Sequence, residues 1–171
     1  MPGKVIGTVL QYGYAGNPSR MSDCVIAPYR YDIAHAADGN IAFGEFVAID
    51  TTNGGIRKLG SSDSDGSAII GVAVRHIGQP KADNENGWYY APGEIVDVML
   101  RGSMTVKLKN TTSIVAGGGV YTANGTNSTT VGDIVCAAAS GYVQVPNAVI
   151  ATGKVDATDK LAEITLLERK A

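Results

Sequence analysis

The stretch "GEIVDVMLRGSMTVKLKN", residues 93–110, decides the fold class, because apolar side chains recur in it at every second position. A period of two places alternate side chains on opposite faces of an extended chain, which is typical of a half-buried β-strand. The residues that share one face are Val96, Val98 and Leu100 in the first half, and Met104, Val106 and Leu108 in the second. Gly102 and Ser103 separate the halves and predict a bend or a bulge. The stretch therefore predicts two consecutive half-buried strands.

Short apolar segments elsewhere are bounded by turn residues in the same way. The chain contains 22 glycines spread along its length. Asn-Gly pairs, the dipeptide best suited to type I′ turns, occur at 53–54, 86–87 and 124–125. The further strand candidates are residues 43–50, 68–78, 118–123, 133–139, 149–156 and 161–169. Only residues 31–39 could form a turn or two of helix, ended by Gly39. We therefore predict an all-β fold, either a small β-barrel or a jelly-roll or tulip-like sandwich.

The segment "GYAGNPSRMSDCVIAPYRYD", residues 13–32, shows neither a helical nor a strand period. The regular succession of strands and turns begins only near residue 40. We therefore predict that residues 1–40 form an irregular N-terminal arm and loops that contact a partner, and that residues 41–171 form the β-domain. The alternative is that residues 13–32 are an ordinary loop packed on its own domain.

Length and charge argue against several classes of function. A chain of 171 residues is long enough to fold as one domain. Its 14 basic and 16 acidic residues give a net charge of -2 without a run of like charge, which argues against a nucleic-acid partner. No stretch approaches the roughly 18 apolar residues that span a membrane. The N-terminus lacks the cleavage site of a signal peptide, so synthesis in a cytoplasm is expected.

The two cysteines, Cys24 and Cys136, each lie beside apolar residues, as buried thiols do. This favours two free thiols, although the two residues could also pair across the fold.

Motifs that carry chemistry are weak. His35 and His76 are far apart and belong to no Cys/His cluster with metal-binding spacing. Residues 61–67 resemble the start of a calcium loop, but Val74 stands where the bidentate glutamate would be. Neither a known nucleophile motif nor a phosphate-binding glycine loop is present. We therefore predict no catalytic residue, no metal site and no cofactor.

Several sequence blocks in a fixed order resemble the structural cement proteins of tailed bacteriophages. The blocks are "GNPSRMSDCVIAPYRY" (16–31), "IAFGEFVAID" (41–50), "IIGVAVR" (69–75), "YAPGEIVDVMLRGSMTVKL" (90–108) and "VAGGGVYT" (115–122). The resemblance covers about residues 10 to 125. The C-terminal third is similar only in its general character and contains none of the matching blocks. It implies a protein on the outer surface of the virion that binds the major capsid protein, bridges its subunits and stabilises the head. It leaves open whether the protein is a homotrimer or a dimer.

The N-terminal segment supplies the candidate partner-binding residues. Tyrosine and arginine are enriched at the energetic centres of interfaces, because they offer a large contact area and directional hydrogen bonds. The candidates are Tyr12, Tyr14, Asn17, Arg20, Tyr29, Arg30 and Tyr31. Pro18 fixes its own φ and restricts Asn17, which would orient the segment.

Two other classes of function remain open. An enzyme with a site assembled by the fold would need a deep pocket lined by His35, His76 or Asp97. A carbohydrate-binding or adhesin-like module would need an exposed aromatic platform, for which residues 88–90, "WYY", are the candidates. Trp88 and its two neighbours could equally belong to the core or to an oligomer interface.

Overall fold

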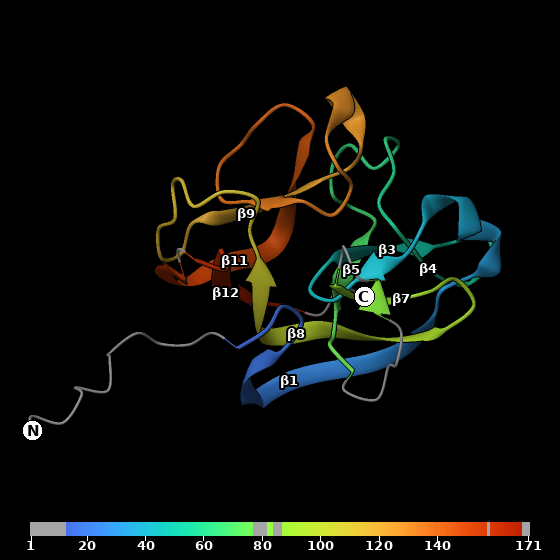
Figure 1. Ribbon diagram of the computed structural model, residues 1–171, viewed down its shortest axis with the longest axis horizontal. Coiled ribbons are helices and arrows are strands. Elements are labelled where there is room, and N and C mark those ends of the chain that lie inside the picture. The colour runs from blue at the N-terminus through green and yellow to red at the C-terminus, as the bar shows by residue number, and fades with distance from the viewer. Residues whose placement is uncertain (1–12, 77–81, 84–86, 157, 169–171) are drawn as a thin grey trace, which may run out of the picture.

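The computed structural model describes residues 13–76, 82–83, 87–156 and 158–168 (Figure 1). Within these residues the fold is all-β, as predicted. The strands are β1 (Pro18–Arg30), β2 (Ile41–Ala42), β3 (Phe46–Asp50), β4 (Gly55–Arg57), β5 (Ile69–Ala73), β6 (Ala82–Asp83), β7 (Gly87–Tyr90), β8 (Ile95–Lys107), β9 (Gly119–Ala123), β10 (Ile134–Val135), β11 (Tyr142–Asp156) and β12 (Leu161–Leu166). Two short 3-10 helices accompany them, η1 (Ile33–Asp38) and η2 (Thr126–Ser128).

Most strands belong to one large antiparallel sheet. Its strand order is β10-β9-β11-β12-β8-β5-β3-β4, and β1 pairs with β8 outside this path. β9, β11 and β12 lie on one side of the molecule and β3, β4 and β5 on the other, with β8 and β1 running beneath them (Figure 1). Within the described residues the path ends at β10 and β4, so the sheet does not close into a barrel. Of the two predicted architectures, the sandwich is therefore the one that fits the observed sheet.

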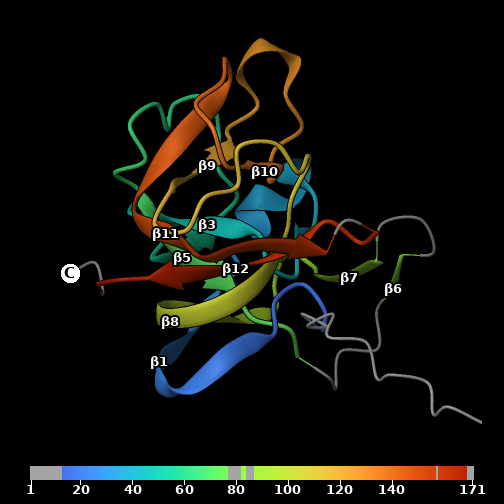
Figure 2. The same cartoon turned by 90° about the vertical axis from the view of Figure 1, so that its left-hand side faces the viewer.

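β8 connects the two sides and contains the stretch that decides the fold class. Its residues Val98 and Met99 pair with β5, and the segment from Gly102 to Lys107 pairs with β12. The sequence predicted two strands here, but the structure has one strand with an irregular point at Gly102, where φ is +123°. Figure 2 shows β1, β8 and β12 lying one above another.

Buried side chains form two clusters on opposite faces of β8. The first joins both sides of the sheet and includes Phe46, Val72, Met99, Met104, Val106, Val120, Ile134, Ile150 and Ile164. The second lies near η1 and includes Tyr31, Ile41, Val47, Ile56, Tyr90, Val96, Val98 and Leu100. Because burial of one large apolar side chain contributes about 1.5 to 3 kcal/mol, the two clusters are the main source of stability.

The N-terminal segment differs from the irregular arm that the sequence suggested. Residues 18–30 form β1, which pairs antiparallel with β8 through three register shifts. Before it, the Gly16 N–H donates to the Thr105 carbonyl at 2.8 Å, and the Thr105 N–H donates to the Asn17 carbonyl at 2.9 Å. The register shifts and the solvent-exposed outer side of β1 remove the alternation that marks a strand in a sequence.

The short elements agree with the sequence where the structure describes them. η1 lies within residues 31–39 and is followed by Gly39 as its C-cap, whose φ is +79°. Asn53 and Gly54 form the turn between β3 and β4, whereas Asn86 lies outside the described residues. Cys24 and Cys136 are free thiols. Among the described residues, no helix is long and apolar enough to cross a membrane.

Candidate functional surface

The predicted partner-binding residues start at an exposed tyrosine. The Tyr14 side chain is 64% exposed, and the Arg75 guanidinium lies 4.2 Å from the centre of its ring, a cation–π contact. Asn17 is half-buried and holds the turn, because its N–H donates to the Tyr14 carbonyl at 3.1 Å. Tyr12 lies outside the described residues.

Arg20 is exposed, but it also binds within the molecule. Its Nε donates to Oε1 of Glu163 at 3.1 Å, and the Ser19 hydroxyl donates to the same oxygen at 2.7 Å. The Glu163 side chain is only 6% exposed, whereas that of Arg20 is 64% exposed. Since Glu163 lies on β12, this ion pair connects the start of β1 to a strand on the far side of β8.

We expect Arg20→Ala to lower the free energy of unfolding by about 1 to 2 kcal/mol, because it removes the cation from a buried carboxylate. Solvent screening of the exposed guanidinium and the remaining Ser19 bond keep the loss below that of a fully buried pair. Urea unfolding measures the effect. Arg30→Ala is the matched control, since its guanidinium is 59% exposed and lies 3.8 Å from Asp32. Equal losses in the two variants would show that the Glu163 contact contributes nothing.

The other three candidates lie at the end of β1. Tyr29 is half-buried and packs on the second cluster, and Arg30 is exposed. Tyr31 is fully buried in that cluster, and its hydroxyl donates to the Gly39 carbonyl at 2.6 Å. Burial, with the nearby charges of Asp38 and Glu45, raises the pKa of the Tyr31 hydroxyl. The Tyr31 side chain is thus part of the core of the described chain, and its part in partner binding stays a prediction.

Sequence reasoning missed an apolar patch next to Arg30. Val25, Ile26 and Ile95 are 37%, 39% and 58% exposed. Ile95 pairs directly with Arg30 across the two strands, and side chains of directly paired residues lie on the same face. Ile26 lies four residues before Arg30 in the same unshifted register and shares this face, whereas its neighbour Val25 points to the other face. We call Ile26, Arg30 and Ile95 the ribbon face. Among the described strands, none pairs with the other edge of β1 from Pro18 to Arg30, and the bridge from Tyr31 to Ile56 of β4 begins only after it, so the ribbon face adjoins an open strand edge.

The structure also contains an open cleft of about 900 Å³. Aromatic side chains of Tyr14, Phe43 and Tyr89 line part of it. Its charged groups include the ion pairs Lys58–Glu45, at 3.2 Å, and Lys109–Asp133. Burial raises the pKa of Glu45, and the Lys58 charge opposes this shift.

The cleft does not have the lining that an enzyme was expected to need. His35, His76 and Asp97 are not among its lining residues. In the described part of the chain, no group of three or more His, Cys, Asp or Glu side chains could hold a metal ion. The cleft thus contains ion pairs next to a few aromatic rings.

The aromatic stretch at residues 88–90 does not form a platform of three exposed rings. Tyr90 is buried, its hydroxyl donates to the Val74 carbonyl at 2.7 Å, and its ring meets Phe43 edge-on at 5.1 Å. Burial, with the charge of Asp97, raises the pKa of Tyr90 to about 12. Tyr89 is half-buried and lines the cleft, and the side chain of Trp88 lies outside the described part. Tyr90 is therefore a core residue.

Comparison with known proteins agrees with the resemblance seen in the sequence. The family described as "Structural cement protein (E217 gp24/Pam3 gp6)" matches residues 2–167. A solved structure titled "The capsid of Myoviridae Phage XM1" superposes with a TM-score of 0.72 at 17% identity and covers 97% of each chain, which shows that the fold is shared. No curated protein matches the sequence. Because the match extends over nearly the whole length, the chain belongs to the structural cement protein family of phage capsids, not to an enzyme family.

Proposed function

We propose that this protein binds the outer surface of a bacteriophage capsid and bridges neighbouring major capsid protein subunits, thereby stabilising the head. Membership in a cement protein family supports the capsid as the binding partner. The exposed side chains of the ribbon face support this surface as the place where the capsid is bound. The ribbon face combines the exposed β-branched side chains of Ile26 and Ile95 with the exposed Arg30 beside an open strand edge. Such a surface suits a protein partner, because apolar anchors beside an arginine are typical of interface centres.

The ribbon face is also held in place before any partner binds. β1 is hydrogen-bonded along β8, and the Arg20–Glu163 ion pair fixes the start of the strand. A preorganised surface loses less conformational entropy on docking than a loose arm does. Tyr14, Asn17, Arg20 and Tyr29 would extend the contact from the ribbon face toward the N-terminus.

The same open edge supports self-association. An unpaired strand edge can accept a strand of another copy, and closed symmetric assemblies are the usual outcome. We propose a homotrimer, with a dimer as the alternative, located on the outer capsid surface after synthesis in the bacterial host cytoplasm. Mass measurement of the purified protein tests this state, and a strictly monomeric species both free and on the capsid would contradict it.

Co-sedimentation with capsids that lack the protein tests the proposed function. We expect the wild-type protein to pellet with the capsids and Ile95→Ala to bind about 5- to 150-fold more weakly, which corresponds to the roughly 1 to 3 kcal/mol of an interface anchor. Val115→Ala is the matched control, because Val115 is 64% exposed and lies on the loop between β8 and β9. Its affinity is expected to stay that of the wild type.

Two results would separate the parts of the proposal. Wild-type protein that stays in the supernatant at all concentrations contradicts capsid binding itself. Unchanged binding of Ile95→Ala, Ile26→Ala and Arg30→Ala contradicts the ribbon face and leaves the family role standing.

A further inference from the structure

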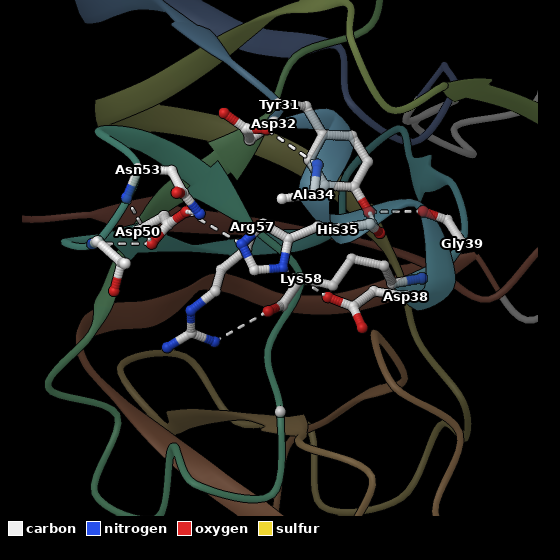
Figure 3. Close-up of polar contacts among 12 residues, drawn as sticks. Tyr31, Asp32, Ala34, His35, Asp38, Gly39, Asp50, Asn53, Arg57 and Lys58 are labelled. Carbon is white, nitrogen blue, oxygen red and sulfur yellow. Dashed lines mark hydrogen bonds and ion pairs between the residues drawn. The ribbon is translucent and has the colours of Figure 1, made fainter.

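His35 lies between two carboxylates that come from different elements (Figure 3). Its Nδ1 is 2.9 Å from Oδ2 of Asp38, which belongs to η1 like His35 itself. Its Nε2 is 3.0 Å from Oδ2 of Asp50, the last residue of β3. The ring thus joins the short helix to the β3–β4 hairpin.

This geometry requires the protonated ring. A carboxylate accepts hydrogen bonds, and only the imidazolium form of histidine carries N–H groups on both nitrogens. In either neutral tautomer, a nitrogen lone pair would face a carboxylate oxygen at about 3 Å. Burial lowers the pKa of His35, but the bonds to Asp50 and Asp38 outweigh it, so that the pKa lies above its ordinary value.

Of the two carboxylates that bind the His35 ring, that of Asp50 is held in place by further hydrogen bonds. Its Oδ1 accepts the N–H groups of Thr52 and Asn53 at 3.0 and 3.3 Å, and its Oδ2 accepts the Asn53 amide at 2.9 Å. The side chain is only 5% exposed. Hydrogen bonding, first of all from His35, lowers the pKa of this carboxyl well below its usual range. The carboxylate therefore stays charged and in place when His35 titrates.

η1 is the movable partner, because it has few other attachments. None of its residues is buried, and Ile33 is 65% exposed. Besides the His35 ring, the attachments are the Tyr31 hydroxyl, which donates to the Gly39 carbonyl at 2.6 Å and more weakly to the His35 carbonyl at 3.3 Å, and Lys58, whose Nζ donates to the Asn40 carbonyl at 2.9 Å. Apart from the long Tyr31 bond to the His35 carbonyl, these contacts bind the chain after the helix.

The other charged groups near His35 already have partners. They are Asp32, which accepts the Ala34 N–H at the start of η1, Arg57, which binds Asp63 through two bonds of 2.7 and 2.8 Å, and Lys58, which pairs with Glu45 at 3.2 Å. Tyr31 carries no charge in this range because its pKa is raised. His35 is thus the group whose charge changes near neutral pH and whose partners span two elements.

We propose that His35 is a pH-sensitive latch that holds η1 against the β3–β4 hairpin and releases it when the ring loses its proton. A histidine with a raised folded-state pKa contributes stability that is fully present below its ordinary pKa of about 6.5 and is lost as the pH rises through the folded pKa. Between these two values, each pH unit raises the ratio of open to closed η1 about tenfold. The latch belongs to the protein itself and does not depend on a capsid.

Nuclear magnetic resonance tests the latch directly, because the chain has only two histidines. His76→Gln assigns the two ring signals, and the His35 signal is expected to titrate with a midpoint above about 6.5. The amides of His35 and Gly39, which donate to the Asp32 and Ala36 carbonyls, report the opening of η1. Their exchange, divided by the intrinsic rate, is expected to speed up about tenfold per pH unit up to that midpoint and then level off.

Variants separate the latch from a general loss of structure. Asp38→Asn changes a carboxylate whose side chain is 46% exposed, so the fold is expected to persist while the His35 midpoint falls. Asp50→Asn should lower the midpoint further, and His35→Gln should make η1 exchange independent of pH. His76→Gln is the control and should leave the opening profile unchanged. A His35 midpoint at or below about 6.5, or η1 exchange that does not follow the midpoint, overturns the proposal.

Discussion

Replacing Phe46 with alanine is expected to lower the free energy of unfolding by about 3 to 5 kcal/mol, the usual cost of removing a buried aromatic side chain. Phe46 lies on β3, is fully buried and belongs to the first cluster. The loss contains both the transfer of the ring to water and the cavity that remains, because the surrounding strands are hydrogen-bonded and relax only partly. In a domain of this size, the melting temperature should fall by roughly 6 to 20 °C.

Thermal unfolding followed by circular dichroism measures the loss. Phe46→Leu keeps most of the volume and should recover most of the stability. Ile33→Ala removes an apolar side chain that is 65% exposed, and it should change the free energy of unfolding by no more than about 0.5 kcal/mol. A Phe46→Ala protein as stable as Ile33→Ala would mean that the first cluster does not hold the sheet together.

The strand pattern of β8 could be predicted from the sequence because burial repeats at every second residue. The apolar side chains predicted for the first half of the stretch, such as Val98, lie in the second cluster. Those predicted for the second half, such as Val106, lie in the first cluster. What the sequence could not show is that β8 is covered on both faces, so that Met99, opposite Val98, is buried in the other cluster. The irregular point at Gly102 lets Met104 follow Met99 into the same cluster despite the odd spacing.

β1 could not be predicted because its pattern is set by its partners. Register shifts interrupt the pairing, and an edge strand has no requirement for regular alternation. The Arg20–Glu163 ion pair joins residues 143 positions apart, which no local pattern reveals. The same applies to Ile95, which reads as the first apolar residue of a strand but lies exposed opposite Arg30.

The partners of His35 show a similar limit. The sequence suggested that the two histidines are isolated, since neither belongs to a metal-binding cluster. In the structure, Asp50 lies 15 residues after His35 and meets its ring only because β3 runs back beside η1. Helical spacing places Asp38 within reach of His35, but it does not indicate that both ring nitrogens are bound.

A methyl group added at Gly71 is expected to lower the free energy of unfolding by about 3 kcal/mol, the upper end of the usual range for overpacking. A Cβ at this position would lie 2.2 Å from the Met99 carbonyl oxygen and 2.7 Å from Cγ1 of Val98. The closest obstacle is the backbone of β8, which cannot move aside as a flexible side chain would. Gly71→Ala should therefore separate β5 from β8, the pairing through which β3, β4 and β5 are connected to β8 in the described sheet.

Gly54→Ala is the matched control for this substitution. Gly54 has a φ of +69°, but no atom lies within 4 Å of an added Cβ, so only the backbone strain of about 1 to 2 kcal/mol applies. Urea unfolding of both variants separates the two effects. If the sides of the sheet meet as described, Gly71→Ala loses more stability than Gly54→Ala, and amides of β5 exchange faster than those of β12. A Gly71→Ala protein that keeps the stability of the wild type would show that β5 and β8 are not in close contact, and that the two sides of the sheet are joined in some other way.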